Sequence, residues 1–301
     1  MKKANFIIIG GQKCGSTFLH HILEQHPEIS MLPGEHAHFE SPEYEKKSIH
    51  DLNSIISELD FNKVIGFKRP SYLLYHEAPS RIIKYNKDIK LIVILRNPID
   101  RFMSAYFHQL NNGVIPINDI NNGIDLLLKK ELRNEFPRSQ EIIDFGFYFK
   151  GLKRYLNFFD QKQVLILTHD ELKNDKNTLF KKCFSFLDVD SNFDIKKLNL
   201  NVRPQKVNYS LLRARIIRKR NSYQYNYNKD KTRLYKKKQS TWEKILFYLY
   251  AGFDRLILIH FISDKKPTIN RDLKKKLLLM YINDINSLEA LIERDLSAWK
   301  K

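Results

Sequence analysis

The stretch Phe6-Ile-Ile-Ile-Gly-Gly-Gln-Lys-Cys-Gly-Ser-Thr-Phe-Leu-His-His-Ile-Leu23 decides the fold, and the rest of the chain is read outward from it. Residues 6–9 are apolar and are followed by two glycines, which predicts a short buried strand that ends in a tight turn. Apolar residues then recur at helical spacing from Phe18, so a helix begins near Gly15 and ends before Pro27. Such a strand, loop and helix start cradle an anion, because backbone N–H groups and the helix dipole point at one place.

The loop departs from the ATP-binding loop at one position. The spacing from Gly10 to Gly15 matches GxxxxGK[ST], but Ser16 stands where the lysine belongs, and the only lysine of the loop is Lys13. A kinase needs that lysine to reach the terminal phosphates beside a magnesium ion. The position of the lysine therefore argues against an ordinary kinase or ATPase. The alternative to an anion-binding loop is a strand-to-helix turn that binds nothing.

The same loop resembles the 5′-phosphosulfate loop of sulfotransferases, especially the heparan-sulfate-modifying enzymes and their bacterial relatives. These carry similar Lys-x-Gly-[Ser/Thr]-[Ser/Thr] loops after a first strand. The resemblance implies a P-loop NTPase-like sulfotransferase fold and 3′-phosphoadenosine-5′-phosphosulfate (PAPS) as the sulfuryl donor. The residues that it assigns to the 5′ end of PAPS are Gln12, Lys13, Cys14, Gly15, Ser16 and Thr17.

The composition indicates a globular protein with anionic partners. The chain has 301 residues, 43% of them hydrophobic, and 52 Lys and Arg against 34 Asp and Glu give a formal charge of +18. That charge favours a nucleotide, an acidic glycan, a nucleic acid or a membrane surface without choosing among them. The two cysteines predict no disulfide framework, and the early first strand leaves no room for a signal peptide. Both features predict a cytoplasmic, bacterial-type enzyme.

A second candidate site follows the strand expected at residues 29–32. The turn Pro33-Gly-Glu-His-Ala-His-Phe39 lies at the carboxyl end of that strand, where open parallel sheets place their sites. The resembling family has a glutamate here as catalytic base. Matching on the glutamate selects Glu35, whereas matching on His38 selects His36, and either can remove a proton from an acceptor hydroxyl. The sequence does not decide between Glu35 and His36 as the base. A polar surface turn without a catalytic role is the third interpretation.

The segment Lys68-Arg-Pro-Ser-Tyr72 follows the strand expected at residues 64–67. It resembles the family's Lys-Ser-Pro-x-Tyr segment, whose lysine approaches the sulfate and the acceptor. The resemblance therefore assigns Lys68 to catalysis, although Arg69 interrupts the match.

A second nucleotide signature follows the buried strand expected at residues 91–95. Asn97 is a good helix N-cap and Pro98 a good first helical residue. Arg96 and Ser104 match the arginine and serine with which the family holds the nucleotide's 3′-phosphate, and a guanidinium fork suits a phosphate. Further along, residues 201–206 resemble the loop that closes over the nucleotide, which adds two phosphate candidates, Arg203 and Lys206.

Three later segments complete the interpretation. Residues 111–146 are loop-rich with a helical patch expected at 126–132, and we expect acceptor recognition there. Residues 213–238 hold eleven Lys or Arg, one acid and four tyrosines, which suits nucleic acid, an anionic glycan or lipid, or a solvated loop without a partner. The last helix is expected over residues 271–299.

Residues 245–262 are apolar at 14 of 18 positions, with Asp254 and Arg255 in their middle. A transmembrane span needs about 20 apolar residues and few charges, so this segment predicts a buried or interfacial helix. Its basic neighbours suit an anionic membrane face, which predicts a peripheral position at the inner membrane.

The alternation of strands and helices predicts an α/β fold with a parallel sheet flanked by helices. We expect a single domain over 1–301 with a basic insertion at 207–243, and a PAPS-dependent sulfotransferase acting on a hydroxyl or amine of a carbohydrate or glycolipid. No metal is expected, since a sulfuryl group carries less charge than a phosphoryl group. The alternatives are a P-loop nucleoside or sugar kinase and a nucleic-acid binder using 213–238; neither accounts for Arg96 and Ser104 as well, so nucleic acid is disfavoured.

Overall fold

The chain divides into two compact units in the computed structural model, which describes residues 2–46, 49–60, 62–195, 198–199, 207–229, 234–262 and 265–301. The first unit comprises Met1–Arg101, Phe147–Pro204 and Ile282–Lys301, and the second comprises Phe102–Gly146 and Gln205–Tyr281. The single domain expected over 1–301, with its insertion at 207–243, stays a prediction.

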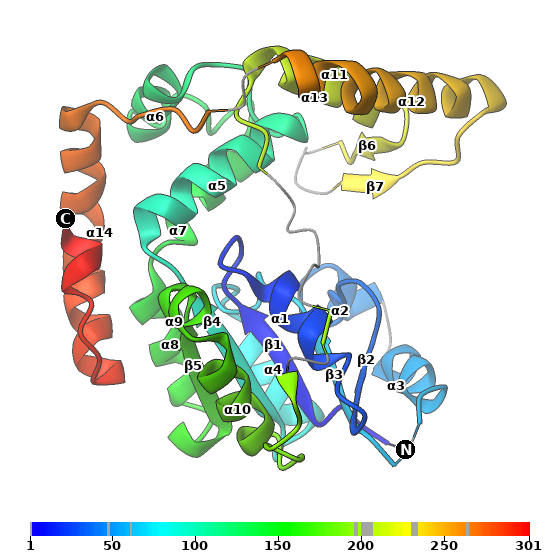
Figure 1. The fold of residues 1–301 in the computed structure, drawn as a ribbon, viewed down its shortest axis with the longest axis vertical. Helices are drawn as coiled ribbons and strands as arrows, with labels where there is room; N and C mark the ends of the chain where they lie inside the picture. The colour runs from blue at the N-terminus through cyan, green and yellow to red at the C-terminus, as the bar shows by residue number, and fades with distance from the viewer. Residues whose placement is uncertain are drawn as a thin grey trace. The chain divides into compact units, whose positions relative to one another are not determined.

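A five-stranded parallel sheet forms the centre of the first unit (Figure 1). Its order is β2-β3-β1-β4-β5, which confirms the predicted α/β class. The central strand, at residues 6–10, is covered on both faces, and every one of its residues is buried. This burial explains why the strand is a continuous apolar run and does not alternate with polar residues. The strands are β1 (Phe6–Gly10), β2 (Ile29–Met31), β3 (Val64–Lys68), β4 (Lys90–Leu95) and β5 (Val164–Thr168).

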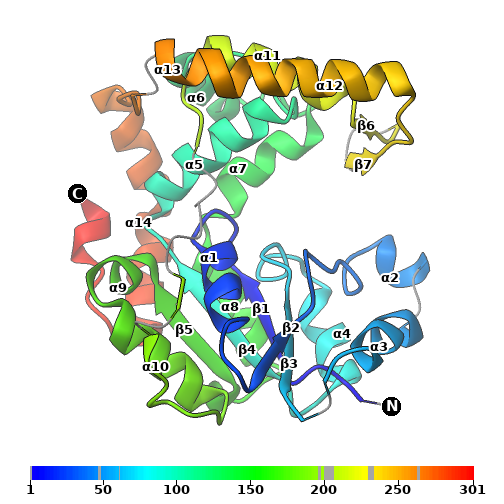
Figure 2. The ribbon, with the colours of Figure 1, turned by 45° about the vertical axis from the view of Figure 1, so that its right-hand side comes forward.

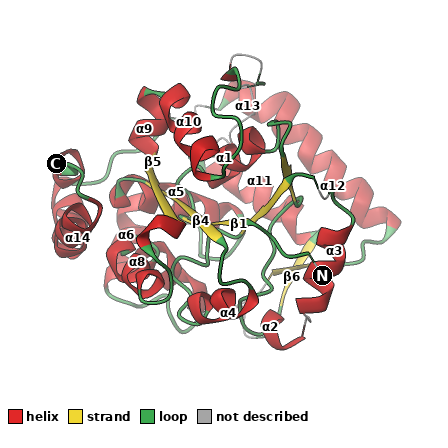
Figure 3. Ribbon diagram, turned by 90° about the horizontal axis from the view of Figure 1, so that it is seen from below, coloured by secondary structure: helices red, strands yellow, loops and turns green. Residues whose placement is uncertain are grey.

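Helices cover both faces of this sheet, as predicted. On one face lie α1 (Ser16–Leu23), α9 (His169–Asn174) and α10 (Lys176–Phe186), and on the other lie α4 (Ala78–Tyr85) and α8 (Tyr148–Leu156) (Figure 3). Two further helices of this unit are α2 (Glu43–Lys46) and α3 (Ile49–Ser57), and η2 (Gln161–Gln163) precedes β5.

The sheet interior is packed so tightly that β3 needs a glycine. A β-carbon at Gly66 would lie 2.2 Å from the ring of Phe6 on the neighbouring strand. This contact explains a glycine in the middle of a strand, where its backbone freedom is otherwise a cost.

The helix after β4 begins where the sequence predicts. α5 (Pro98–Asn111) starts at the expected proline, and Asn97 Oδ1 accepts a hydrogen bond of 2.9 Å from the backbone N–H of Ile99. Its first residues belong to the first unit and the remainder to the second.

The second unit is mostly helical (Figure 2). α11 (Leu211–Ser222) runs beside α12 (Thr241–Phe253), which continues through the π-helix η4 (Asp254–Leu258) into α13 (Ile259–Phe261). The other elements are α6 (Ile120–Leu128), η1 (Pro137–Gln140), α7 (Glu141–Asp144) and the antiparallel hairpin β6 (Tyr225–Tyr227) and β7 (Leu234–Lys236).

Three local predictions need correction. The loop conformation considered for 213–238 is wrong for the described residues, because Ser210 caps α11 by accepting from the N–H of Arg213, and a hairpin follows this helix. The helix expected at 126–132 is instead α6, which begins after its N-cap Asp119. The last helix, α14 (Arg271–Ile292), ends early because Glu293 has a φ of 51°, and η5 (Ser297–Lys300) follows.

Candidate active site

The loop between β1 and α1 is built to present backbone N–H groups. Gly15, the N-cap of α1, has a φ of 109°, a left-handed conformation that glycine adopts at low cost. Lys13 also has a positive φ, 66°. No described side chain caps the first turn of α1, so its N–H groups and the helix dipole are available to an anion.

Two arginines from the segment after β4 hold this loop. The guanidinium of Arg101 donates to the backbone oxygen of Gln12 at 3.2 Å and to its side-chain oxygen at 2.9 Å. Arg101 is completely buried, a position that no sequence pattern had singled out. Arg96 donates to the backbone oxygen of Lys13 at 3.5 Å, and its buried Nε has no hydrogen-bond partner among the described residues.

This arrangement concentrates positive charge with little compensation. Burial, and next the charge of Arg101, lower the pKa of Lys13 to about 8, while Glu35 opposes the shift and Arg96 adds to it. Depressed lysine pKa values mark sites where the ammonium is destabilised until a negative group arrives. The orphaned Arg96 Nε and the crowded cations therefore fit an anionic nucleotide.

Cys14 contributes to the loop as a packed side chain. Its thiol is completely buried, and its Sγ lies 3.6 Å from the hydroxyl of Tyr148 on α8. Burial raises the pKa of the Cys14 thiol, which makes it a poor nucleophile. Only the backbone of Cys14 is suited to an anion, and its N–H already donates to Gly11 O at 3.2 Å.

The ends of β2 and β3 bring the second group of predicted residues to the same loop. Lys68 is only 6% exposed, and its ammonium donates to Thr17 Oγ1 at 2.9 Å and lies 4.0 Å from Glu35 Oε1. Burial lowers the pKa of Lys68, and Glu35 opposes that shift. Glu35 is thus an electrostatic neighbour of both catalytic lysine candidates, as parallel strands with adjacent carboxyl ends require.

His36 is directed toward its own turn. Its Nε2 lies 3.1 Å from the carbonyl oxygen of Pro33, and its ring stacks on His38 with centroids 5.8 Å apart. Its backbone N–H donates to Lys68 O at 3.3 Å, so the main chain of the turn is fixed against β3. The geometry therefore favours Glu35 over His36 as the group that faces the lysines.

Arg69, which interrupts the family pattern, has a structural partner that the sequence concealed. Its guanidinium donates to both oxygens of Glu40, at 2.8 and 2.6 Å, and to Glu35 Oε2 at 3.1 Å. Glu40 is completely buried and also accepts from Ser71 Oγ. Burial lowers the pKa of the Arg69 guanidinium, but the hydrogen bonds to Glu40 outweigh burial and raise this pKa above its ordinary value. The pair fixes the turn that carries Glu35.

We expect Arg69→Ala to lower the free energy of unfolding by about 3–5 kcal/mol, because removing one partner leaves a buried carboxylate uncompensated. Urea denaturation followed by circular dichroism measures the change. Lys129→Ala is the control, since its ion pair with Asp125 is largely exposed and such pairs contribute under about 1 kcal/mol. Equal effects of the two substitutions would contradict the role of Arg69.

The remaining predicted residues are placed as follows. Ser16 is buried at the first position of α1. Ser104 is buried on α5, in the part that belongs to the second unit. Arg203 and Lys206 lie outside the described residues, so their roles stay predictions.

His169, on α9, is a residue near the loop that the sequence did not distinguish from a core residue. It borders Gly15. Burial and the charge of Arg96 lower the pKa of His169 to about 4.

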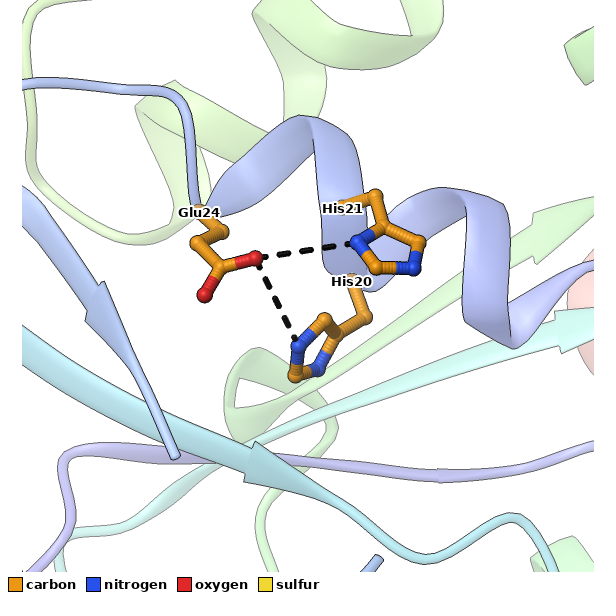
Figure 4. A group of neighbouring side chains, drawn as sticks. All are labelled: His20, His21 and Glu24. Carbon is orange, nitrogen blue, oxygen red and sulfur yellow. Dashed lines mark ion pairs between the residues drawn. The ribbon is translucent and has the colours of Figure 1, made fainter. Parts of the chain in front are cut away.

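One cluster of metal-ligand type occurs among the described residues, at the end of α1 away from the loop (Figure 4). His20 Nε2 and His21 Nδ1 lie 3.9 and 3.6 Å from Glu24 Oε2. Burial lowers the pKa of His20 to about 4, so this ring is neutral at pH 7 and the contact is not an ion pair there. The expectation that catalysis needs no metal stays a prediction.

Comparison with known proteins identifies the family. The family model described as "Sulfotransferase domain" matches residues 3–248. Human heparan sulfate glucosamine 3-O-sulfotransferase 3B1 is 32% identical over 169 residues, 56% of this chain and 42% of that protein. Luciferin sulfotransferase of Photinus pyralis is 26% identical over 229 residues, 68% of this chain and 55% of that protein. The chain spans about half the length of these relatives.

A solved structure agrees in fold. A sulfotransferase from Alicyclobacillus acidocaldarius superposes with a TM-score of 0.70 at 21% sequence identity, covering 100% of both chains. This likeness confirms the predicted P-loop NTPase-like sulfotransferase fold. Together with the family match over most of its length, it shows that the chain belongs to the sulfotransferase domain family.

Proposed function

We propose that this protein transfers a sulfuryl group from PAPS to an acceptor hydroxyl or amine. The observation that supports the proposal is the meeting of the anion loop with Lys68 and Glu35, because the Lys68 ammonium donates to Thr17 Oγ1 at 2.9 Å and lies 4.0 Å from Glu35 Oε1. Incubating the protein with labelled PAPS and candidate acceptors, with product analysis, tests it. Absence of transfer to any glycan, glycolipid or small phenol would count against the activity.

In this proposal the loop residues Gln12, Lys13, Gly15, Ser16 and Thr17 hold the 5′-phosphosulfate, and Cys14 supports the loop through its buried side chain. Lys13 lies on the leaving side and stabilises the negative charge that appears on the phosphate oxygen, which is electrostatic catalysis. Lys68, tied to Thr17, assists at the sulfuryl oxygens. Arg96 and Ser104 are proposed for the 3′-phosphate, with Arg203 and Lys206 as further contacts.

The acceptor side is assigned to Glu35, with His36 as the alternative base. The acceptor oxygen attacks sulfur in line, an O–S bond forms, and the bond between sulfur and the phosphate oxygen breaks. The acceptor proton passes to the base, and 3′-phosphoadenosine-5′-phosphate (PAP) leaves with the electron pair. The exposed carboxylate of Glu35, held by Arg69 and near Lys68, supports this assignment.

The proposed acceptor is a carbohydrate or glycolipid. Relatives named for heparan sulfate and the positive charge of the chain support this class. A relative named for luciferin makes a small aromatic hydroxyl the comparison acceptor in the same screen. The proposed compartment is the cytoplasm, where the two free cysteines stay reduced.

The first alternative, a P-loop kinase, has one distinguishing measurement. A kinase would hydrolyse or transfer phosphate from ATP with magnesium, and Ser16 at the position of the kinase lysine disfavours it. The second alternative, nucleic-acid binding, predicts salt-sensitive binding that survives loss of Lys13.

The assignment of Arg96 predicts a preference among nucleotides. We expect PAP to bind far more tightly than AMP, and Arg96→Ala to reduce that preference by about ten- to 150-fold, because one charge-assisted hydrogen bond contributes about 1.5–3 kcal/mol. Isothermal titration calorimetry measures both affinities. Arg133→Ala, an exposed arginine bound to Gln140, is the control. Equal affinity of the unmodified protein for PAP and AMP would remove the 3′-phosphate assignment.

A further inference from the structure

The outward side of the long helix formed by α12, η4 and α13 carries large apolar side chains in water. We call this side the outer face and define it by five residues that are each more than 60% exposed. They are Trp242 (74%), Tyr248 (71%), Leu249 (62%), Leu256 (73%) and Phe261 (83%). Soluble proteins rarely expose contiguous apolar patches of this kind unless a partner covers them.

The opposite side of the same helix already has its packing partner. The rings of Tyr250 and Tyr223 lie 5.8 Å apart, and the guanidinium of Arg220 on α11 lies 5.6 Å from the ring of Phe247. Leu258 is buried. The helix therefore packs one side against α11, where Phe247 and Tyr250 are half-buried and Leu258 is buried, while its other side carries large apolar side chains that no described residue covers.

The acid that interrupts the apolar run is turned inward. Asp254 is 8% exposed, and its oxygens accept from Arg213 of α11 at 2.8 and 3.1 Å. Within residues 244–262 the other charged side chains are Lys244 and Arg255, and both are exposed cations. Asp254 therefore does not interrupt the outer face, and the exposed charges of this range are both positive.

We propose that the outer face docks onto the surface of an anionic lipid bilayer, with the helix axis in the plane of the interface. Trp242 and Tyr248 have the amphipathic rings that settle at the headgroup level. The exposed cations at the ends of the segment, Lys236, Lys238 and Lys265, meet anionic headgroups. None of the described helices is long and apolar enough to cross a bilayer, so the contact is peripheral.

Charge decides between a bilayer and a second copy of this chain. Pairing two outer faces would bring together two copies that each carry the exposed cations Lys244 and Arg255 in this segment and a formal net charge of +18. Like charges oppose that pairing, whereas anionic lipid removes the repulsion. The inference is independent of the proposed sulfuryl transfer, because it uses no residue of the candidate active site.

Co-sedimentation with vesicles of phosphatidylcholine and phosphatidylglycerol tests the docking. The protein is expected to pellet with these vesicles at low salt, to be released at high salt, and to ignore pure phosphatidylcholine. Leu256→Ser combined with Phe261→Ser should weaken the affinity about a hundredfold by removing buried apolar area. Leu279→Ser, at a leucine on α14 that is 62% exposed, should leave the affinity unchanged.

Two additional measurements separate the contributions. Lys244→Gln combined with Arg255→Gln should weaken vesicle affinity about thirtyfold and flatten its salt dependence. The emission of Trp242 should shift to the blue on vesicles, against a constant background from Trp299, which is 2% exposed and is the other of the two tryptophans.

Circular dichroism of each variant confirms that it is folded. The proposal is overturned if the protein stays in the supernatant with anionic vesicles, or if Leu279→Ser weakens binding as much as the outer-face pair. It is also overturned if sedimentation velocity finds a dimer that the outer-face substitutions dissociate while vesicle binding is absent. Sulfuryl transfer to a soluble acceptor is unaffected by any of these results.

Discussion

Replacing Lys13 by alanine is expected to lower kcat about a thousandfold while the fold stays intact. The ammonium is the cation proposed to face the departing phosphate oxygen, and removing one preorganised donor from such a position costs about 10²–10³ in rate. Because the loop lies among Arg101 and Arg96, it stays ordered without the lysine. Initial rates with labelled PAPS and an authentic acceptor measure the effect.

The chain offers a matched control for this substitution. Lys130 has a φ of 65°, nearly the 66° of Lys13, but is exposed. Lys130→Ala therefore reproduces the backbone cost of placing alanine in the left-handed region without touching the site. A similar loss of rate in both variants would mean that backbone strain, and not the ammonium, is responsible.

The pKa of Lys13 adds a pH dependence to this prediction. Lysine is charged below its pKa, and burial followed by Arg101 lowers that of Lys13 to about 8. We expect kcat/KM to fall about tenfold per pH unit above 8, because this parameter reports the free enzyme. The pH above which kcat falls should be higher than the pH above which kcat/KM falls, because the bound anionic donor favours the charged ammonium and raises its pKa.

The second large effect is expected at Glu35. Glu35→Gln should lower kcat about a hundred- to ten-thousandfold with PAP affinity preserved, which is the usual contribution of a positioned acid–base group. The amide keeps the shape of the side chain and an oxygen that accepts from Arg69, so the loss reports proton transfer. Single-turnover kinetics separates this chemical step from binding and product release.

His36→Asn is the companion variant, and it should retain activity within a few-fold because its ring faces Pro33. The reverse ranking of the two variants would transfer the base to His36. If both retained near-full activity on an authentic acceptor, the turn after β2 would not supply the base, and the proposed mechanism would be withdrawn.

The sheet and the positions of several candidate site residues could be predicted from the sequence, because these depend on local patterns. Buried parallel strands read as apolar runs, and the glycine loop, the Asn97 cap and the position of Lys68 follow from adjacent residues. The carboxyl ends of neighbouring parallel strands share one edge of the sheet, so the residues that follow β1, β2 and β3 could be assigned to that edge from the order of the strands.

The rest depends on contacts between distant residues or on local signals that other patterns masked. The pairing of Arg69 with Glu40 spans 29 positions, and Arg101 holds Gln12 across 89. α11 was hidden because its basic residues show no apolar periodicity, although its cap Ser210 was visible. The early end of α14 rests on one left-handed residue, Glu293, which amphipathic spacing does not reveal.

The burial of the Cys14 side chain within the anion loop has a consequence for the chemistry of its thiol. The side chain is completely buried against Tyr148, so alkylating agents and oxidants reach it only while the loop is open. We expect a nucleotide bound to the loop to lower the rate at which an alkylating agent labels Cys14, so that donor occupancy is read from a native thiol without an engineered probe.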